Sequence, residues 1–566
     1  MKKPYDLSLS IILLAGSAFA AEPPDAGTLL REQPRIPAAK PAPLTPPTPG
    51  ATQAPQEKDA GPVVLVKSFR ITGSSLIANS ELVAQLGEYV GKAYSFRQLQ
   101  SLALHLVGYY AQKGYLARIF IAPQDFADGA VTFTVIEGKL GTLKFDTQID
   151  ASRIDAARAQ RFISGRLHPG EPFSLTAAGE AMTILNEQPG IEARSALKPG
   201  AGEGEIDLVV TATDTPLTIY SLKVDNNATQ ATGKNQIGAS ISLQNPSGHF
   251  DQATLFANAS DGVTFVNADY SLAVGERGLR AGASASSLRY RITETSFEAL
   301  RGDGSASILS AYFSYPLQRL TQRSLTVNAS LAQKRMTDYA FDLETGSRNL
   351  SVGNVGLSGW SVNPWIGGIT SYGAELTAGN VDRSANAADM AQDQKGRRTD
   401  GHFTKLAWRL GQTVSVAEGW NVVANLRGQV AERNLDSSER LSLGGPANVR
   451  AYPGDEAAGD EGYLLSLNLV HPVSETVAAK LFFDYGEITL NKNLWDNWNV
   501  GNPGLPNRYA LKGIGAGVDW MIAKNTSLSM MLAAPLGDNP GRDSNELDPN
   551  AGRKQARFSA SLLVNF

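Results

Sequence analysis

The sequence predicts an exported protein in which two small α+β modules precede a large antiparallel β-barrel that crosses a membrane. Three observations support this fold class. The chain begins with an export signal, its middle section contains helix and strand patterns of small-module length, and residues 216–566 form short alternating segments separated by Gly, Asn, Asp and Pro. Such alternation gives a strand one apolar face and one more polar face. Because lipid-facing and lumen-facing residues alternate, a barrel needs no long apolar run.

The composition limits the possible partners. The chain has 566 residues, enough for several domains, and a net charge of −4, which is too small to indicate nucleic-acid binding. It has no cysteine, which excludes disulfides and thiolate metal ligands. The five histidines are scattered without metal-ligand spacing. We therefore expect no nucleic acid, metal or other cofactor.

Residues 1–20 have the pattern of a secretory signal peptide. Lys2 and Lys3 form its charged start, Leu7 to Ala15 its apolar run, and Ala18-Phe19-Ala20 a small-residue cleavage site. A buried helix is the alternative, but the segment is N-terminal and a proline-rich stretch soon follows. The sequence thus predicts export from the cytoplasm.

Residues 21–33 predict a short helix that Asp25 can cap and that carries Leu29 and Leu30. Such a helix is too short to be stable alone in water, so it needs a cavity or a partner. A disordered N-terminus is the alternative. Residues 34–62 are rich in proline and predict an extended, semi-rigid linker of about 3 Å per residue.

Residues 63–138 predict a compact β-α-α-β-β module. Strands are expected at 64–71, 116–121 and 131–136, and a short helix at 80–86. Ser95 and Gln98 form a capping-box pattern at the start of a longer helix, which Gly114 is placed to end. One face of that helix carries Phe96, Leu99, Leu102, Ala103, Leu106 and Tyr110.

Residues 139–213 show a similar pattern of helix and strand segments and predict a second module. A helix is predicted over 175–186, with Ala178, Ala181 and Leu185 on one face, and a strand over 205–211.

Residues 216–566 predict the barrel. Ile237, Ala239, Ile241 and Leu243 alternate with small or polar residues, and the same pattern ends in Phe566. A soluble sandwich would give the same alternation. The export signal, the number of segments and the final aromatic residue favour the barrel, because a terminal aromatic resembles the signal that outer-membrane barrels present to their assembly machinery.

Two separated motifs carry the most specific information. The first runs from Gly444 to Pro453, is followed by Gly459 to Tyr463, and puts Arg450 at the tip of a turn-rich loop. The second, Phe482 to Gly486, puts Asp484 within a strand-like segment. In order and spacing they resemble the lumen loop and partner strand of the β-barrel transporters of two-partner secretion.

That resemblance implies roles for these residues. It implies that Arg450 pairs with Asp484 inside the barrel. Val449 and Tyr452 would pack the loop tip, and Phe483 and Gly486 would belong to the wall. A guanidinium fits a carboxylate with two parallel hydrogen bonds. The pair either serves transport or only fixes the loop in place so that the barrel folds. The family usually has glycine where this chain has Ala451, which matters if that backbone needs a positive φ.

The resemblance extends from Asp25 to Phe566. Residues 108–115 and 135–138 are similar to the first polypeptide-transport-associated (POTRA) domain of this family, and residues 185–191 and 197–200 to the second. Residues 21–33 occupy the place of the family's plug helix. The family also implies sixteen strands, which residues 216–566 can accommodate at about 9–11 residues per tilted strand.

The implied function is a non-enzymatic outer-membrane pore with its POTRA domains in the periplasm. Its partners would be an unfolded exoprotein of the haemolysin or filamentous-adhesin type, outer-membrane lipid, and the barrel-assembly machinery. An extended client can add a strand to a POTRA sheet. The candidate contact residues are Tyr109, Tyr110, Tyr115 and Phe120, although for each of them a place in the module core is the favoured alternative.

Other functions remain open on the sequence. A barrel-assembly factor of the same superfamily and a passive porin would have a similar architecture. A lipase is disfavoured because the chain lacks a Gly-x-Ser-x-Gly motif, and it also lacks a Walker loop for ATP.

Overall fold

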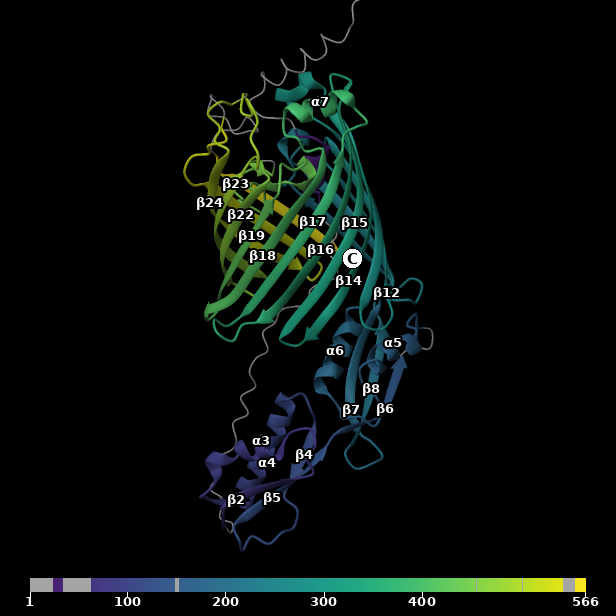
Figure 1. Cartoon of the computed structure of the whole chain (residues 1–566), viewed down its shortest axis with the longest axis vertical. Coiled ribbons are helices and arrows are strands. Elements are labelled where there is room, and N and C mark those ends of the chain that lie inside the picture. Colours follow the sequence, from purple (N-terminus) through teal and green to yellow (C-terminus); the bar gives the residue numbers. More distant parts are fainter. Residues whose placement is uncertain (1–23, 34–62, 148–151, 455, 501, 543–554) are drawn as a thin grey trace, which may run out of the picture.

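The computed structural model describes residues 24–33, 63–147, 152–454, 456–500, 502–542 and 555–566. The predicted signal peptide (1–20) and linker (34–62) lie outside the described residues. The described chain forms a tall barrel with two small modules stacked beneath it (Figure 1). No helix in these described ranges is long and apolar enough to cross a membrane.

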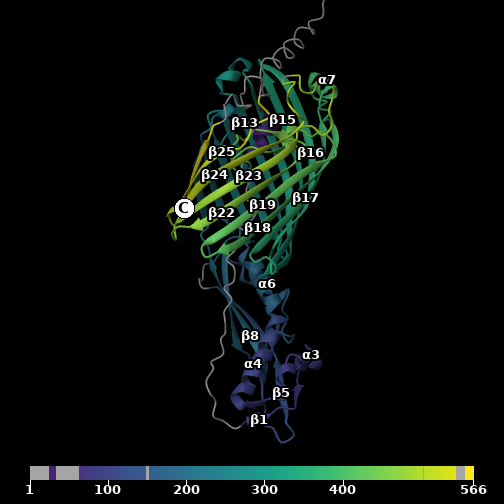
Figure 2. The ribbon, with the colours of Figure 1, turned by 90° about the vertical axis from the view of Figure 1, so that its left-hand side faces the viewer.

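Within the described residues, sixteen strands form one closed antiparallel barrel (Figure 2), as predicted. The last strand pairs with the first, with Ser561 opposite Asp225 and Asn565 opposite Ser221. The barrel strands are β9 (Thr218–Asp225), β10 (Gln236–Gln244), β11 (Gln252–Ala259), β12 (Val263–Val274), β13 (Leu279–Arg291), β14 (Asp303–Leu320), β15 (Arg323–Ala340), β16 (Leu343–Val362), β17 (Ile369–Asp382), β18 (Gly401–Ala417), β19 (Trp420–Ala431), β22 (Glu461–Pro472), β23 (Val477–Thr489), β24 (Arg508–Ala523), β25 (Thr526–Pro535) and β26 (Arg557–Asn565).

The two faces of the barrel wall differ in the way the alternation predicts. Leu309, Leu331 and Val355 point outward and are 63%, 70% and 60% exposed. On the opposite face of β16, Leu350 and Val352 are buried inside the barrel. An outer surface of this kind suits lipid, so the soluble-sandwich alternative is excluded.

The first module contains β1 (Val63–Leu65), β2 (Ser68–Thr72), α3 (Asn79–Ala84), η1 (Gly87–Tyr89), β3 (Ala93–Ser95), α4 (Phe96–Gln112), β4 (Ala117–Phe120) and β5 (Ala130–Glu137). Its main sheet has the order β2-β5-β4, and β1 pairs with β3. The strand expected at 64–71 is therefore two strands in different sheets. The Ser95–Gln98 capping box is present, but Phe96 is 51% exposed and lies outside the core.

The second module contains β6 (Lys139–Thr147), α5 (Ala156–Ser164), α6 (Leu175–Asn186), β7 (Ile191–Pro199) and β8 (Glu205–Asp214), with sheet order β6-β8-β7. Helix α6 has the predicted bounds and buries Ala181 and Leu185. Helix α5 was not predicted from the sequence, although Asp155 caps it and Phe162 lies in the module core.

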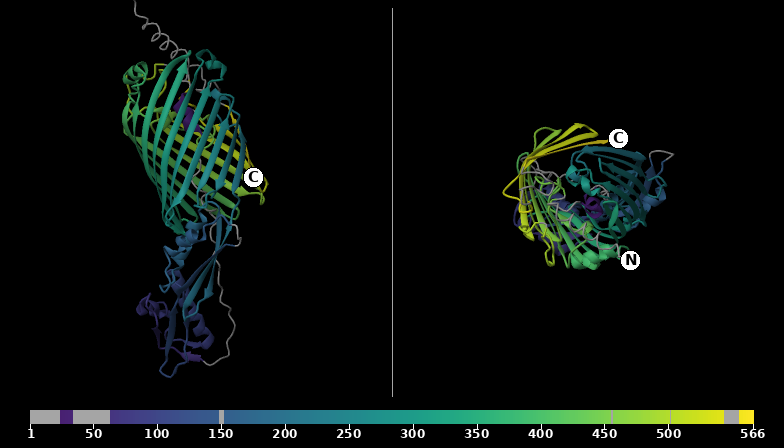
Figure 3. Two further views of the ribbon diagram at one scale, coloured as in Figure 1. Left: turned by 90° about the vertical axis from the view of Figure 1, so that its right-hand side faces the viewer. Right: turned by 90° about the horizontal axis from the view of Figure 1, so that it is seen from above.

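The second module is docked against the lower ends of β12 to β14 (Figure 3). Phe162 packs edge-on against Phe250 of the barrel, with ring centroids 5.6 Å apart. Arg319 of β14 donates from Nε to Glu187 at 2.7 Å, and Arg158 donates to the carbonyl of Ala273 at 2.7 Å. Apolar and polar contacts together fix this module to one side of the barrel mouth.

A seven-residue helix, α2 (Ala26–Glu32), lies inside the barrel, where the view from above shows it within the ring of strands (Figure 3). Asp25 caps it by accepting from the backbone N–H of Thr28 at 2.8 Å. Leu29 is 1% exposed in a cluster with lumen residues such as Phe265 and Phe403, and Leu30 packs at its edge. The barrel supplies the surroundings that so short a helix needs.

Candidate functional site: the barrel lumen

The segment between β19 and β22 folds back into the lumen as a loop. It contains η4 (Ser437–Glu439), β20 (Leu441–Ser442) and β21 (Ala458–Gly459). Its tip is a tight turn in which Gly445 has a φ of +115° and Asn448 donates to the carbonyl of Gly444 at 2.7 Å. Buried apolar side chains, including those of Val449 and Tyr452, hold the tip against the wall.

Arg450 projects from this tip into a dense set of hydrogen bonds with β22 and β23. It binds Asp484 through Nε at 2.8 Å and Nη2 at 2.6 Å, and its backbone N–H donates to the same carboxylate at 3.1 Å. Nη1 donates to Asn468 at 2.8 Å and Nη2 to Ser466 at 2.9 Å. The two charged side chains are only 10% and 1% exposed, so water screens the pair weakly.

Aromatic and glycine neighbours complete the site. The guanidinium carbon of Arg450 lies 3.6 Å from the ring centroid of Phe482, a cation–π contact. Because side chains alternate along β23, Phe483 lies on the opposite face from Asp484. The family resemblance placed Phe483 in the wall motif beside Asp484, whereas Phe482 is the aromatic residue in contact with Arg450. A Cβ on Gly486 would lie 2.7 Å from Leu443, so its hydrogen lets the loop approach the wall.

Ala451 is not among the described residues that have a positive φ, so its backbone conformation does not call for glycine. Its side chain faces Gly513 of β24, where an added Cβ would lie only 2.8 Å from the Cβ of Ala451. The alanine therefore takes up space that the wall glycine leaves. The departure from the family's usual glycine does not disturb the Arg450 geometry.

The acidic residues after the loop tip are also structural. Asp460 is 1% exposed, pairs with Arg440 at 3.3 Å, and accepts backbone N–H groups from Leu435 at 3.1 Å and Lys492 at 2.8 Å. Glu461 pairs with the Lys492 side chain at 2.6 Å.

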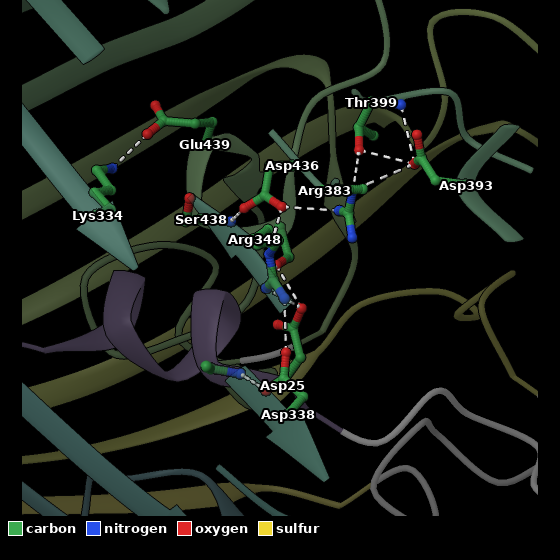
Figure 4. A network of polar contacts seen from close by, with 12 residues as sticks. Asp25, Lys334, Asp338, Arg348, Arg383, Asp393, Thr399, Asp436, Ser438 and Glu439 are labelled. Atoms are coloured by element: carbon green, nitrogen blue, oxygen red, sulfur yellow. Dashed lines mark hydrogen bonds and ion pairs between the residues drawn. The ribbon is translucent and has the colours of Figure 1, made fainter. Parts of the chain in front are cut away.

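A second lumen site anchors the start of α2 (Figure 4). Arg348 of β16, with a side chain 3% exposed, donates to Asp25 from Nη2 at 2.7 Å and to Asp338 from Nη1 at 2.6 Å. Asp338 also accepts the backbone N–H of Ala26 at 2.8 Å. The Ser437 hydroxyl donates to Asp25 at 2.6 Å. The N-terminal end of α2 is thus tied to both the wall and the folded-back loop.

Close packing reinforces this anchor. A Cβ on Gly27 would lie 2.3 Å from the Ser437 hydroxyl and 2.8 Å from the backbone nitrogen of Ser438. Further along α2, Arg31 donates to the Ser437 carbonyl at 2.8 Å. Neither Arg348 nor Ser437 was found from the sequence, because only the fold brings them beside residues hundreds of positions away.

The η4 part of the same loop is held by two lysines. Glu439 of η4 is ion-paired with Lys405 at 2.8 Å and with Lys334 (Figure 4). Its side chain is 6% exposed. The loop that contacts α2 is therefore also fixed to β15 and β18.

Comparisons with known proteins identify the family. Residues 204–518, more than half of the chain, match the family described as haemolysin secretion/activation protein ShlB/FhaC/HecB, and residues 64–138 match the ShlB-type POTRA domain. The chain belongs to this family. It is an outer-membrane transporter of two-partner secretion, with its POTRA domains in the periplasm.

Known transporters are similar to this chain over most of its length. It is 26% identical over 563 residues to the heme/hemopexin transporter protein HuxB of Haemophilus influenzae strain 86-028NP, covering 95% of this chain and 97% of HuxB. It is 25% identical to the outer membrane transporter CdiB of Dickeya dadantii, covering 72% and 73% of the two chains. The solved structure of CdiB from Escherichia coli shares the fold, with a TM-score of 0.67, 20% identity, and coverage of 93% and 94%.

The aromatic candidates in the first POTRA domain have different surroundings. Tyr110 is fully buried, so it belongs to the core and cannot contact a client in the folded domain. Burial raises its pKa to about 12, and its hydroxyl donates to Glu137 at 2.9 Å. Tyr109 is partly exposed, donates to Glu81 and lies under Lys113, whose Nζ is 5.2 Å from the ring centroid.

Of the other two candidates, Tyr115 lies at the junction between the domains and Phe120 at the far end of β4. Tyr115 is partly buried and its backbone pairs with Ser174 of the second POTRA domain. Phe120 is partly buried on β4 under Arg118, whose guanidinium carbon is 5.0 Å from the ring centroid. Of the four, Tyr109, Tyr115 and Phe120 retain exposed surface.

Proposed function

We propose that α2 closes the pore of this transporter, and that an unfolded partner exoprotein captured by the two POTRA domains takes its place in the lumen. The observation that carries this proposal is the position of α2. A seven-residue helix lies in the lumen and is held there by a few polar side chains and one apolar face. Such a helix can leave as a unit, since it has little structure of its own to unfold.

Arg450 would serve transport by keeping the folded-back loop in one position while the client passes. The loop contacts the plug directly: a Cβ on Gly454 would lie 3.1 Å from Glu32 at the end of α2. A loop fixed by Arg450 and Asp484 thus presents a constant surface to whatever occupies the lumen. No catalytic step is required, and folding of the client outside the cell would favour export.

The client would be a secreted exoprotein of the haemolysin or adhesin type. It would add an extended segment to a POTRA sheet, with main-chain hydrogen bonds giving affinity. Tyr109, Tyr115 and Phe120 are the aromatic contacts that we retain for it. We assign residues 21–33 to the plug, 63–138 and 139–213 to the POTRA domains and 216–566 to the barrel. The barrel would be bounded by outer-membrane lipid and inserted by the barrel-assembly machinery.

The test is secretion of a candidate exoprotein by cells that carry Arg450→Ala or Arg450→Lys. Barrel level and heat-modifiable mobility are measured in parallel. We expect a folded barrel and strongly reduced secretion for Arg450→Ala. Arg450→Lys should keep partial activity, because lysine keeps the charge but lacks the planar set of N–H donors of the guanidinium. Normal secretion by Arg450→Ala in a folded barrel would refute the transport role of this arginine. Loss of the barrel itself would assign Arg450 to folding alone.

Cells that lack this transporter distinguish secretion from the barrel-assembly alternative. If the transporter serves secretion, these cells should keep normal levels of other outer-membrane barrels and lose only the secreted client. A general loss of outer-membrane barrels would favour the assembly function.

A further inference from the structure

The polar anchor of α2 continues beyond Arg348 to Asp436 and Arg383 (Figure 4). Asp436, whose side chain is fully buried, lies 2.7 Å from Nε of Arg348 on one side. On its other side it accepts from Nη2 of Arg383 at 3.1 Å. One carboxylate is therefore shared between Arg348, which holds the plug, and Arg383, which directly follows β17.

Arg383 uses its remaining nitrogens to hold α7 (Ala387–Lys395), a helix in the loop between β17 and β18. Nη1 donates to both carboxylate oxygens of Asp389 at 3.0 Å, and Nε donates to the hydroxyl of Thr399 at 3.1 Å. Asp393, 3.6 Å from Nε, accepts the backbone N–H groups of Thr399 and Asp400, each at 3.0 Å. Arg383 thus fixes both the helix and the segment that returns to the barrel.

Helix α7 lies at the end of the barrel opposite the POTRA domains (Figures 1 and 2). Because those domains are periplasmic, α7 is on the extracellular side. The chain of contacts therefore runs from α2 in the lumen through Arg348, Asp436 and Arg383 to an extracellular helix.

The strength of these linked contacts depends on α2 itself. Buried ion pairs are screened by water far less than exposed ones. The helix covers η4 and Arg348, and Asp25 supplies one of the carboxylates that Arg348 contacts among the described side chains. When α2 leaves, water reaches the Arg348–Asp436 pair and weakens it. The segment that carries Asp436 then holds Arg383 less firmly.

The same contacts act in the reverse direction. Asp436 directly precedes Ser437 and Ser438, the residues against which Asp25 and Gly27 are packed. If Arg383 is lost, Asp436 keeps Arg348 but loses its contact with the α7 loop. The loop surface that receives α2 is then less well fixed.

We propose that Arg383 is a positioning residue that couples the plug to the extracellular loop: docked α2 stabilises α7, and ordered α7 keeps α2 docked. The inference rests on the proposed role of α2 as the plug. A coupling between two sites is reciprocal, so each end must respond to a change at the other. A client that emerges and displaces the α7 loop would thereby help to keep the pore open.

The first arm of the test measures the open fraction of the full-length transporter in planar bilayers. Arg383→Ala should raise the open fraction about fivefold or more, the lower end of typical couplings. Arg383→Lys should have a smaller effect. The control is Arg289→Ala, since Arg289 lies exposed on β13 outside the network. In a chain that lacks residues 24–33, Arg383→Ala should cause no further increase, because nothing is left to release.

The second arm measures the reverse effect. Trypsin added to intact cells should cleave after Lys395, in the last turn of α7, faster in Asp25→Asn than in the unaltered transporter. Heat-modifiable mobility verifies that each barrel is folded.

The outcomes separate the coupling from the proposed function. If removal of residues 24–33 leaves the pore closed, the plug function fails. If that removal opens the pore but Arg383→Ala does not, the coupling is overturned and the plug stands. Unchanged cleavage after Lys395 in an Asp25→Asn pore that opens more often would also overturn the coupling.

Discussion

Arg450 directs its guanidinium at Asp484, Ser466 and Asn468 and lies over the ring of Phe482. At the scale of single residues, this set explains why a short motif in the sequence carries so much information. The pair is buried, so each charge depends on the other for compensation. Removing one partner of such a pair typically costs about 3–5 kcal/mol, whereas replacing both with uncharged groups costs less.

A double-mutant cycle should reveal this dependence. We expect Arg450→Ala and Asp484→Ala each to lower the temperature at which the barrel loses its heat-modifiable mobility. The double variant should be less destabilised than the sum of the two, because no buried charge is left unpaired. Strict additivity of the two shifts would mean that the residues act independently.

Gly513 and Ala451 offer a reciprocal test of packing. An added methyl group on Gly513 would meet the Ala451 side chain at 2.8 Å, so Gly513→Ala should destabilise the barrel by about 1–3 kcal/mol, as overpacking does. Adding Ala451→Gly should restore much of the loss. Thermal stability of the purified barrel measures both effects. Failure of the second substitution to rescue the first would show that the two side chains do not compete for this space.

Gly27 provides the corresponding test in α2. Gly27→Ala would place a methyl group 2.3 Å from the Ser437 hydroxyl, which should loosen the helix and increase pore conductance. The matched control is Gly87→Ala, since nothing lies within 4 Å of a Cβ there. Equal conductance of the two variants would contradict the close fit of α2 against η4.

Among the helices, periodicity and capping residues predicted those whose signals are local in the sequence. Helix α6 has the predicted bounds, and the Ser95 capping box opens α4 as expected. Helix α5 was missed, because its nine residues are mostly alanine, arginine and glutamine with only Phe162 and Ile163 as strong apolar positions. The lumen anchors of α2 could not be predicted, since Arg348 and Ser437 meet Asp25 only through barrel closure.

The attachment of the second POTRA domain is also a property of elements. Arg319 joins the end of β14 to Glu187 just after α6, and its side chain is 13% exposed. Arg319→Ala should loosen this domain from the barrel, which limited proteolysis between residues 199 and 205 or at the domain junction would detect as faster cleavage. Arg194→Ala is the control, because Arg194 pairs with Glu192 on the exposed surface of β7 and its side chain is 85% exposed. Similar cleavage of both variants would argue that apolar contacts such as Phe162–Phe250 suffice.

At the scale of the whole molecule, the barrel and its plug are separable in stability. The wall is a closed ring of antiparallel pairs, and α2 contributes one apolar face and one carboxylate to the lumen. Without α2, Arg348 still faces Asp338 and Asp436, so it does not become an unpaired buried charge. We therefore expect a chain that lacks residues 24–33 to fold and insert normally, with nearly unchanged heat-modifiable mobility, and to conduct ions continuously.

Secretion by the same plugless chain tests how the parts cooperate. The POTRA domains and the Arg450 loop remain in place, so it should still export its client while admitting large antibiotics that the closed transporter excludes. The control is Leu29→Met, which keeps the apolar face of α2 and should leave the pore closed. If the plugless barrel fails to insert, α2 is a folding element. If it inserts but conducts no more than the unaltered transporter, another part of the lumen, with the folded-back loop around Tyr452 as the first candidate, seals the pore.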